Sequence, residues 1–172
     1  MAELQPVGLT GYRRLLLEWS DIPLRAALAA TFIVHGYQKI FIDGLDKFAP
    51  MLAHLGVPAP SIMAWVVALT EFCGGIAIAL GLCTRLAALG HAATMVVAIS
   101  TVHFTQGFMS HAGMGANGPQ AMGFEWQFAL LCIALSLAIR GAGPLSVDHL
   151  IRNYCCRKPA AGSSPGGAPV AP

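Results

Sequence analysis

Four stretches of this 172-residue chain are long, apolar and almost free of charge, at residues 22–42, 62–83, 86–104 and 122–139. A helix that crosses a bilayer needs roughly 20 mostly apolar residues. The stretches are rich in Ala, Leu and Ile and lack the alternation of barrel strands. They predict an all-α membrane protein, a four-helix transmembrane bundle in up-down-up-down order. The alternative, buried helices of a soluble protein, is disfavoured because few polar faces separate the stretches.

The composition excludes several classes of protein. Only 10% of the residues are Asp, Glu, Lys or Arg, whereas 56% are hydrophobic; soluble domains carry about 25% charged residues. So few charges argue against a cytosolic enzyme and against a disordered protein. The formal net charge of +2 is too small to indicate a nucleic-acid partner.

Basic residues between the stretches predict the orientation. One side of the membrane has only Lys39 and Lys47. Because cytoplasmic loops carry an excess of Lys and Arg, we expect both termini in the cytoplasm and a multi-pass protein of the bacterial inner membrane. The basic residues of the cytoplasmic side are Arg13, Arg14, Arg25, Arg85, Arg140, Arg152, Arg157 and Lys158.

The chain divides into four segments. We expect a cytoplasmic or interfacial segment at residues 1–21, the four-helix domain at 22–140, a cytoplasmic juxtamembrane segment at 141–158 and a disordered Pro/Gly-rich tail at 159–172. Apolar residues at helical spacing predict a short interfacial helix in the first outer loop. The second outer loop, residues 105–121, is either an ordered cap or a mobile linker.

Polar side chains inside membrane stretches are costly and commonly functional. His35 and Lys39 lie one turn apart on the first stretch, Glu71 near the middle of the second, His103 at the end of the third and Glu125 at the start of the fourth. All five fall in the outer half of the bundle, and we expect them to line one ligand-binding pocket. A buried His moves protons and a buried carboxylate can hold one, so the catalytic candidates are Glu71, His35 and Glu125.

A structural interpretation of the same residues stays open. In it, Lys39 forms an ion pair with Glu71 or Glu125 that sets the helix register, and the first-stretch His bonds across the interface. Arg25 and Arg85 are expected to be lipid-facing anchors whose charged ends reach the membrane surface.

No metal site is predicted. His103 and His111 are weak candidates for metal ligands, because their spacing matches no strong ligand motif. His91 is expected to be a contact between helices.

Small residues and cysteines also have expected roles. Gly74 and Gly75 predict close helix approach. The five cysteines contain no C-x-x-C motif. Cys73 and Cys132 are interpreted as packing residues. The adjacent cysteines 155–156 lie beside basic residues, and they form either a plain reduced pair or a reactive, lipidated or metal-binding one.

Taken together, the motifs resemble those of the DoxX family of four-helix membrane proteins. The resemblance covers residues 25–150. It consists of an Arg that begins the first helix, H-G-x-x-K, E-x-x-G-G with G-x-x-T-R, G-x-E, and G-x-G-P-x-S-x-D. The matching positions are Arg25, His35, Gly36, Lys39, Glu71, Gly74, Gly75, Gly81, Arg85, Glu125 and Asp148.

This resemblance implies a subunit of a membrane oxidoreductase system that contacts the quinone pool. Lys39 and His35 would bond a quinone carbonyl, and Glu71 or Glu125 would relay a proton. The sequence has no flavin, haem or iron–sulfur signature, so no intrinsic cofactor is expected, and electrons would come through a membrane or soluble redox partner.

Two other functions stay open, and the sequence does not decide whether the chain is an enzyme. One is a non-enzymatic membrane scaffold or assembly factor whose polar cluster is structural. The other is a transporter of small solutes, which would need a homo-oligomer because four helices per chain are few. The lipid bilayer is the partner common to all three functions.

Overall fold

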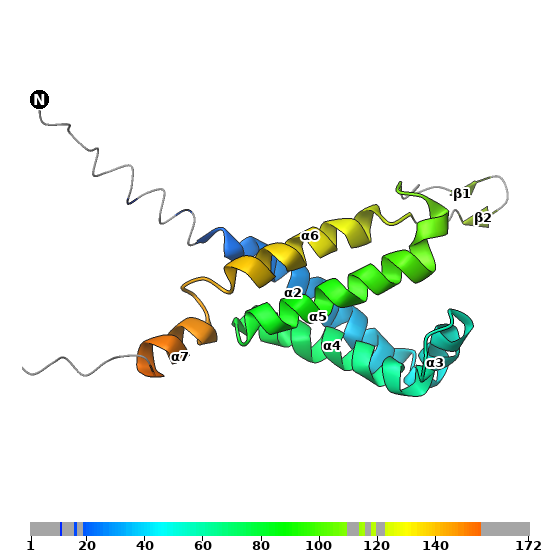
Figure 1. Cartoon of the computed structure of the whole chain (residues 1–172), viewed down its shortest axis with the longest axis horizontal. Helices are drawn as coiled ribbons and strands as arrows, with labels where there is room; N and C mark the ends of the chain where they lie inside the picture. The colour runs from blue at the N-terminus through cyan, green and yellow to red at the C-terminus, as the bar shows by residue number, and fades with distance from the viewer. Residues whose placement is uncertain are drawn as a thin grey trace, which may run out of the picture.

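The computed structural model describes residues 19–109 and 123–155, together with residues 11, 16, 114–115 and 118–119 (Figure 1). Its helices are α2 (Asp21–Tyr37), α3 (Leu45–His54), α4 (Pro60–Leu80), α5 (Thr84–Ala98), α6 (Glu125–Arg140) and α7 (Val147–Cys155). The π-helical turn η1 (Gln38–Ile42) continues α2; the π-helical turn η2 (Ile99–His103) and the 3₁₀ turn η3 (Phe104–Gln106) continue α5. The two-residue strands β1 (Met114–Gly115) and β2 (Gly118–Pro119) pair antiparallel.

Among the described residues, two helical segments are long and apolar enough to cross a membrane: Pro60–Leu80 and Thr84–Gln106. The helix of the fourth apolar stretch is shorter than predicted, with 16 residues in α6. It begins at Glu125 rather than at residue 122, because the amides of Phe124 and Glu125 bond to the carbonyls of Gly107 and Phe108 at 3.1 and 2.9 Å. The short interfacial helix predicted in the first outer loop is present as α3.

The long helices pack side by side, α2 mainly against α4, α4 against α5 and α5 against α6. In Figure 1, α3 and the β1–β2 pair lie at one end of the molecule, and α7 lies at the other. The core between the helices consists of Leu28, Ala29, Phe32, Ile78, Ala88, Ala92, Met95, Leu130, Ala134 and Leu137. Large apolar side chains also cover the outer faces, as in a protein surrounded by lipid; exposed examples are Val34, Trp65, Leu69, Leu86, Val96, Leu135 and Ile139.

Glycines bring α4 close to both neighbours. A Cβ atom at Gly36 would lie 2.5 Å from the backbone nitrogen of Phe72, and one at Gly74 would lie 2.6 Å from Cε1 of His91. Real Cβ contacts are not this short, so only glycine fits at these positions without rearrangement. The predicted packing role of the small residues in the second stretch is therefore confirmed.

Arg25 is not the lipid-facing anchor that the sequence predicted. Its side chain is buried, with 6% of the residue exposed. Nε and Nη2 donate to the carbonyls of Ile78 and Ala79 at 3.0 and 2.7 Å. Nη1 donates to the carbonyls of Ala142 and Leu145 at 3.0 and 2.6 Å. The prediction was wrong because the carbonyls at the end of α4, where the helix dipole is negative, attract the cation more strongly than the membrane surface does.

Asp148 contributes a group of opposite charge to the same junction. Its two carboxylate oxygens accept hydrogen bonds from the backbone amides of Cys83 and Thr84 at 2.7 and 3.0 Å. These amides lie at the start of α5, where unpaired donors and the positive end of the helix dipole favour an anion. Gly81 lies between the two charged groups with φ +69°, and a Cβ there would meet Arg25 Nη2 at 2.8 Å.

Helix α7 was not predicted within the juxtamembrane segment. Ser146 caps it, since its hydroxyl accepts a hydrogen bond from the amide of His149 at 3.1 Å. Val147, Leu150, Ile151 and Tyr154 repeat at helical spacing, and this pattern would have revealed the helix. The expected N-terminal segment and C-terminal tail lie almost wholly outside the described residues.

We expect Arg25→Gln to lower the free energy of unfolding by about 3 kcal/mol or more, because each hydrogen bond from a charged donor contributes about 1.5–3 kcal/mol. Arg85→Gln is the matched control, since Arg85 is exposed and the change in charge is the same. Thermal unfolding in detergent, followed by circular dichroism, measures both variants. Equal stability of the two variants would contradict the structural role of Arg25.

Candidate functional site

An ion pair between Lys39 and Glu71 joins the two charged side chains predicted within the first two stretches. Lys39 lies on η1, and Glu71 lies on α4. The side chain of Glu71 is 5% exposed and that of Lys39 is 23% exposed. The carboxylate is therefore buried between the helices, while the side chain of Lys39 is partly exposed.

One aromatic ring contacts this pair, and three others form a cluster on α2, η1 and α4. Nζ of Lys39 lies 5.2 Å from the centre of the Phe48 ring on α3, within the range of a cation–π contact. The rings of Tyr37 and Phe41 are 5.0 Å apart, and those of Phe41 and Phe72 are 5.8 Å apart. Tyr37 and Phe41 are exposed, so the cluster of Tyr37, Phe41 and Phe72 reaches the outer surface of the helices.

His91 lies behind Glu71 and is fully buried. Its Nδ1 lies 2.7 Å from the carbonyl of Ala87, and its ring packs edge-on to Phe32 at 4.0 Å. Its ring lies against Gly74 of α4, three residues after Glu71. Nε2 is buried and has no hydrogen-bond partner in the described part of the chain. His91 is thus a contact between helices, as expected, and also a second polar group beside Glu71 that was not among the predicted site residues.

The other predicted site residues lie on α2, η2 and α6. His35 is exposed on α2. His103 Nε2 lies 3.0 Å from Nε2 of Gln127, so its partner on α6 is Gln127. Glu125 is half-buried at the start of α6. Of the five residues expected to share one pocket, the structure joins Lys39 with Glu71 by an ion pair.

Both Lys39 and His103 lie in π-helical turns, η1 and η2. A π-helical turn inserts an extra residue into a helix and turns the following side chains, and such turns are frequent at functional sites. The π-helical turn η1 contains Lys39, whose side chain reaches Glu71 on α4.

Metal and thiol chemistry have less support. Within the described residues, no three His, Cys, Asp or Glu side chains gather to hold a metal ion, and His111 lies outside them. Cys73 and Cys132 are free and exposed. They lie on outer faces and are not packed between the helices as expected, because their positions fall on the lipid side of α4 and α6. Cys156 and the side chain of Cys155 are outside the described part.

Comparisons with known proteins agree with this description. A family model described as DoxX matches residues 21–104. The chain is 30% identical over 134 residues to a protein of Bacillus subtilis (strain 168) named "Putative oxidoreductase CatD", an alignment that covers 78% of this chain and 88% of that protein. No solved structure matches the chain.

A double-mutant cycle on Lys39→Met and Glu71→Gln should give a coupling energy of about 1–2 kcal/mol, since contacting charged residues couple while distant ones do not. Chemical or thermal unfolding in detergent supplies the four stabilities. The cycle of Lys39→Met with Glu125→Gln is the control and should give less than about 0.5 kcal/mol. Similar coupling in both cycles would show that the ion pair is not specific.

Proposed function

Since this chain belongs to the DoxX family of integral membrane proteins, we propose that it is the membrane subunit of an oxidoreductase system and binds a quinone beside Lys39 and Glu71. The name of the Bacillus subtilis relative supports the redox part of this proposal. The quinone part depends on the ion pair and the aromatic rings.

The observation that carries the proposal is a partly exposed charged pair with the Phe48 ring against Lys39, and exposed aromatic rings two residues to either side of Lys39 in the chain. A quinone is a flat apolar ring with two carbonyl oxygens, and it travels within the bilayer. The exposed rings of Tyr37 and Phe41 offer stacking partners for such a ring. The partly exposed ammonium group of Lys39 is a charged donor for one of its carbonyl oxygens.

Glu71 and His91, which are more deeply buried than Lys39, would take part in proton transfer. Reduction of a quinone to a quinol takes up two electrons and two protons. We assign both electrons to a redox partner subunit. One proton comes from the ammonium group of Lys39 bonded to the quinone oxygen, and the other comes from Glu71, whose carboxylate takes up a proton when Lys39 turns from it. Water returns both protons afterwards. His91, buried beside Glu71, extends the path by which that carboxyl group regains a proton.

One observation favours a second candidate function, a membrane scaffold without chemistry. Lys39 and Glu71 already neutralise each other, and an ion pair between helices sets their register without any ligand. In that case the redox activity would belong wholly to a partner, and Glu71 would influence stability alone.

We also propose that four segments cross the bacterial inner membrane, with both termini in the cytoplasm. The grouping of α3 and the β1–β2 pair at one end of the molecule, opposite α7, supports this arrangement (Figure 1). The excess of basic residues on the side of α7 supports its orientation.

The quinone proposal is tested by titrating the purified protein in lipid nanodiscs with a short-chain ubiquinone. The double variant Lys39→Met/Glu71→Leu, which leaves no unpaired charge, should bind about tenfold more weakly, the effect of losing one charged hydrogen bond. Lys47→Met, an exposed residue of α3, is the matched control. Unchanged affinity in the folded double variant would exclude this site and favour the scaffold.

The orientation is tested by single cysteines in a cysteine-free background. A membrane-impermeant maleimide added to intact cells should label Lys47→Cys and leave Asn153→Cys unlabelled until the membrane is opened. Both residues are exposed, so access to the reagent depends on the side of the membrane. Labelling of the cysteine at position 153 in intact cells would show that the orientation is the opposite of the proposed one.

A further inference from the structure

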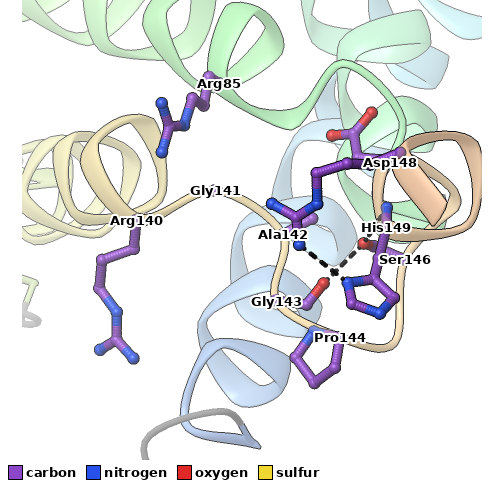
Figure 2. A pocket seen from close by; sticks show the side chains of 10 residues that line it. Arg85, Arg140, Gly141, Ala142, Gly143, Pro144, Ser146, Asp148 and His149 are labelled. Atoms are coloured by element: carbon purple, nitrogen blue, oxygen red, sulfur yellow. Dashed lines mark hydrogen bonds between the residues drawn. The ribbon is translucent and has the colours of Figure 1, made fainter. Parts of the chain in front are cut away.

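A basic pocket of about 620 Å³ lies at the end of the molecule opposite Lys39 (Figure 2). The last turn of α6, the loop of residues 141–146 and the first turns of α5 and α7 surround it. Three arginines line it, Arg85, Arg140 and Arg152, together with His149. They are three of the ten Lys and Arg residues in the whole chain, so the pocket concentrates positive charge.

Two carboxylates offset part of this charge, but neither forms an ion pair with Arg85 or Arg152 among the described residues. Both oxygens of Asp148 accept backbone amides at the start of α5. Arg140 pairs with Asp21 at 3.0 Å, and Arg152 bonds to the ring of His149 at 3.0 Å. No hydrogen bond or ion pair joins the exposed guanidinium of Arg85 to the described residues, which leaves its donors directed to a ligand or solvent.

The loop that forms the pocket presents backbone rather than bulky side chains. Gly141 and Gly143 have φ of +85° and +71°, which residues with a side chain rarely adopt. Figure 2 shows Arg85, Asp148 and His149 arranged around the loop of Gly141, Ala142 and Gly143. The volume is typical of pockets that hold small molecules or head groups.

Apolar side chains next to the pocket indicate that the ligand also has an apolar part. Leu86 follows Arg85 and is 73% exposed, and Ile139 precedes Arg140 and is 76% exposed. Leu150, Ile151 and Tyr154 form an exposed apolar stripe on α7, which is typical of a helix that lies in the membrane interface. A charged cavity flanked by exposed apolar residues fits an amphiphile with an anionic head and acyl chains.

We propose that this pocket binds the phosphate group of an anionic phospholipid. Arg85 and Arg152 hold the phosphate oxygens through their guanidinium groups, whose paired donors match phosphate geometry. The acyl chains lie along the outer faces of α5 and α6, beside Leu86 and Ile139. The site is separate from Lys39 and Glu71, so it does not depend on the quinone proposal.

Native mass spectrometry of the purified full chain, titrated with phosphatidylglycerol or phosphatidylcholine, tests this site. The wild-type protein should bind phosphatidylglycerol more tightly than phosphatidylcholine. Arg85→Gln should weaken phosphatidylglycerol binding about fivefold, the effect of one basic residue near an anionic lipid. Lys47→Gln removes the same charge at the other end and should leave binding unchanged. Circular dichroism verifies that both variants are folded.

Inorganic phosphate distinguishes the lipid from a soluble ligand. If phosphatidylglycerol binds in an Arg85-dependent way that an excess of inorganic phosphate does not abolish, the lipid assignment is supported. If inorganic phosphate binds through Arg85 while the protein shows no preference between the two lipids, the lipid assignment is overturned and a soluble phosphate ligand replaces it. No lipid preference with no phosphate binding, or an equal loss in Lys47→Gln, overturns the site itself.

Discussion

The buried guanidinium of Arg25 is the interaction on which the arrangement of the helices depends. Its four hydrogen bonds connect the start of α2 with the end of α4 and with the loop that follows α6. Asp148 joins the same loop region to the start of α5. Two opposite charges thus use the carbonyls at the end of one helix and the amides at the start of another, where a low dielectric strengthens both interactions.

The two ends of the molecule use charge differently. At the Arg25 end, four neutral backbone carbonyls accept hydrogen bonds from the buried guanidinium, so the role of Arg25 is structural. At the other end, Lys39 and Glu71 compensate each other, Lys39 remains partly exposed, and His91 keeps a buried nitrogen without a hydrogen bond among the described residues. A pair of this kind can exchange partners when a ligand arrives, whereas the Arg25 junction cannot do so without leaving carbonyls unpaired.

Some features could be predicted because they depend on local pattern. The helix at α3 follows from apolar spacing, and the packing roles of Gly74 and His91 follow from small or polar residues in an apolar helix. Other features depend on which way a side chain points, which residue spacing does not determine. Cys73 lies on an outer face and Arg25 points inward, both against expectation. Helix α7 was not predicted although its apolar residues have helical spacing, because it lies outside the membrane stretches.

The sequence by itself determined the class of the protein and the family to which it belongs. Apolar length decides which segments suit a membrane, and scarce charges mark the positions that need compensation, because hydrocarbon cannot solvate them. Only the tertiary structure decided how these charges are compensated. It paired Lys39 with Glu71, directed Arg25 to the end of α4, and gathered Arg85, Arg140 and Arg152 around one loop. The reason is physical: compensation depends on distances between segments far apart in the chain, and packing sets those distances.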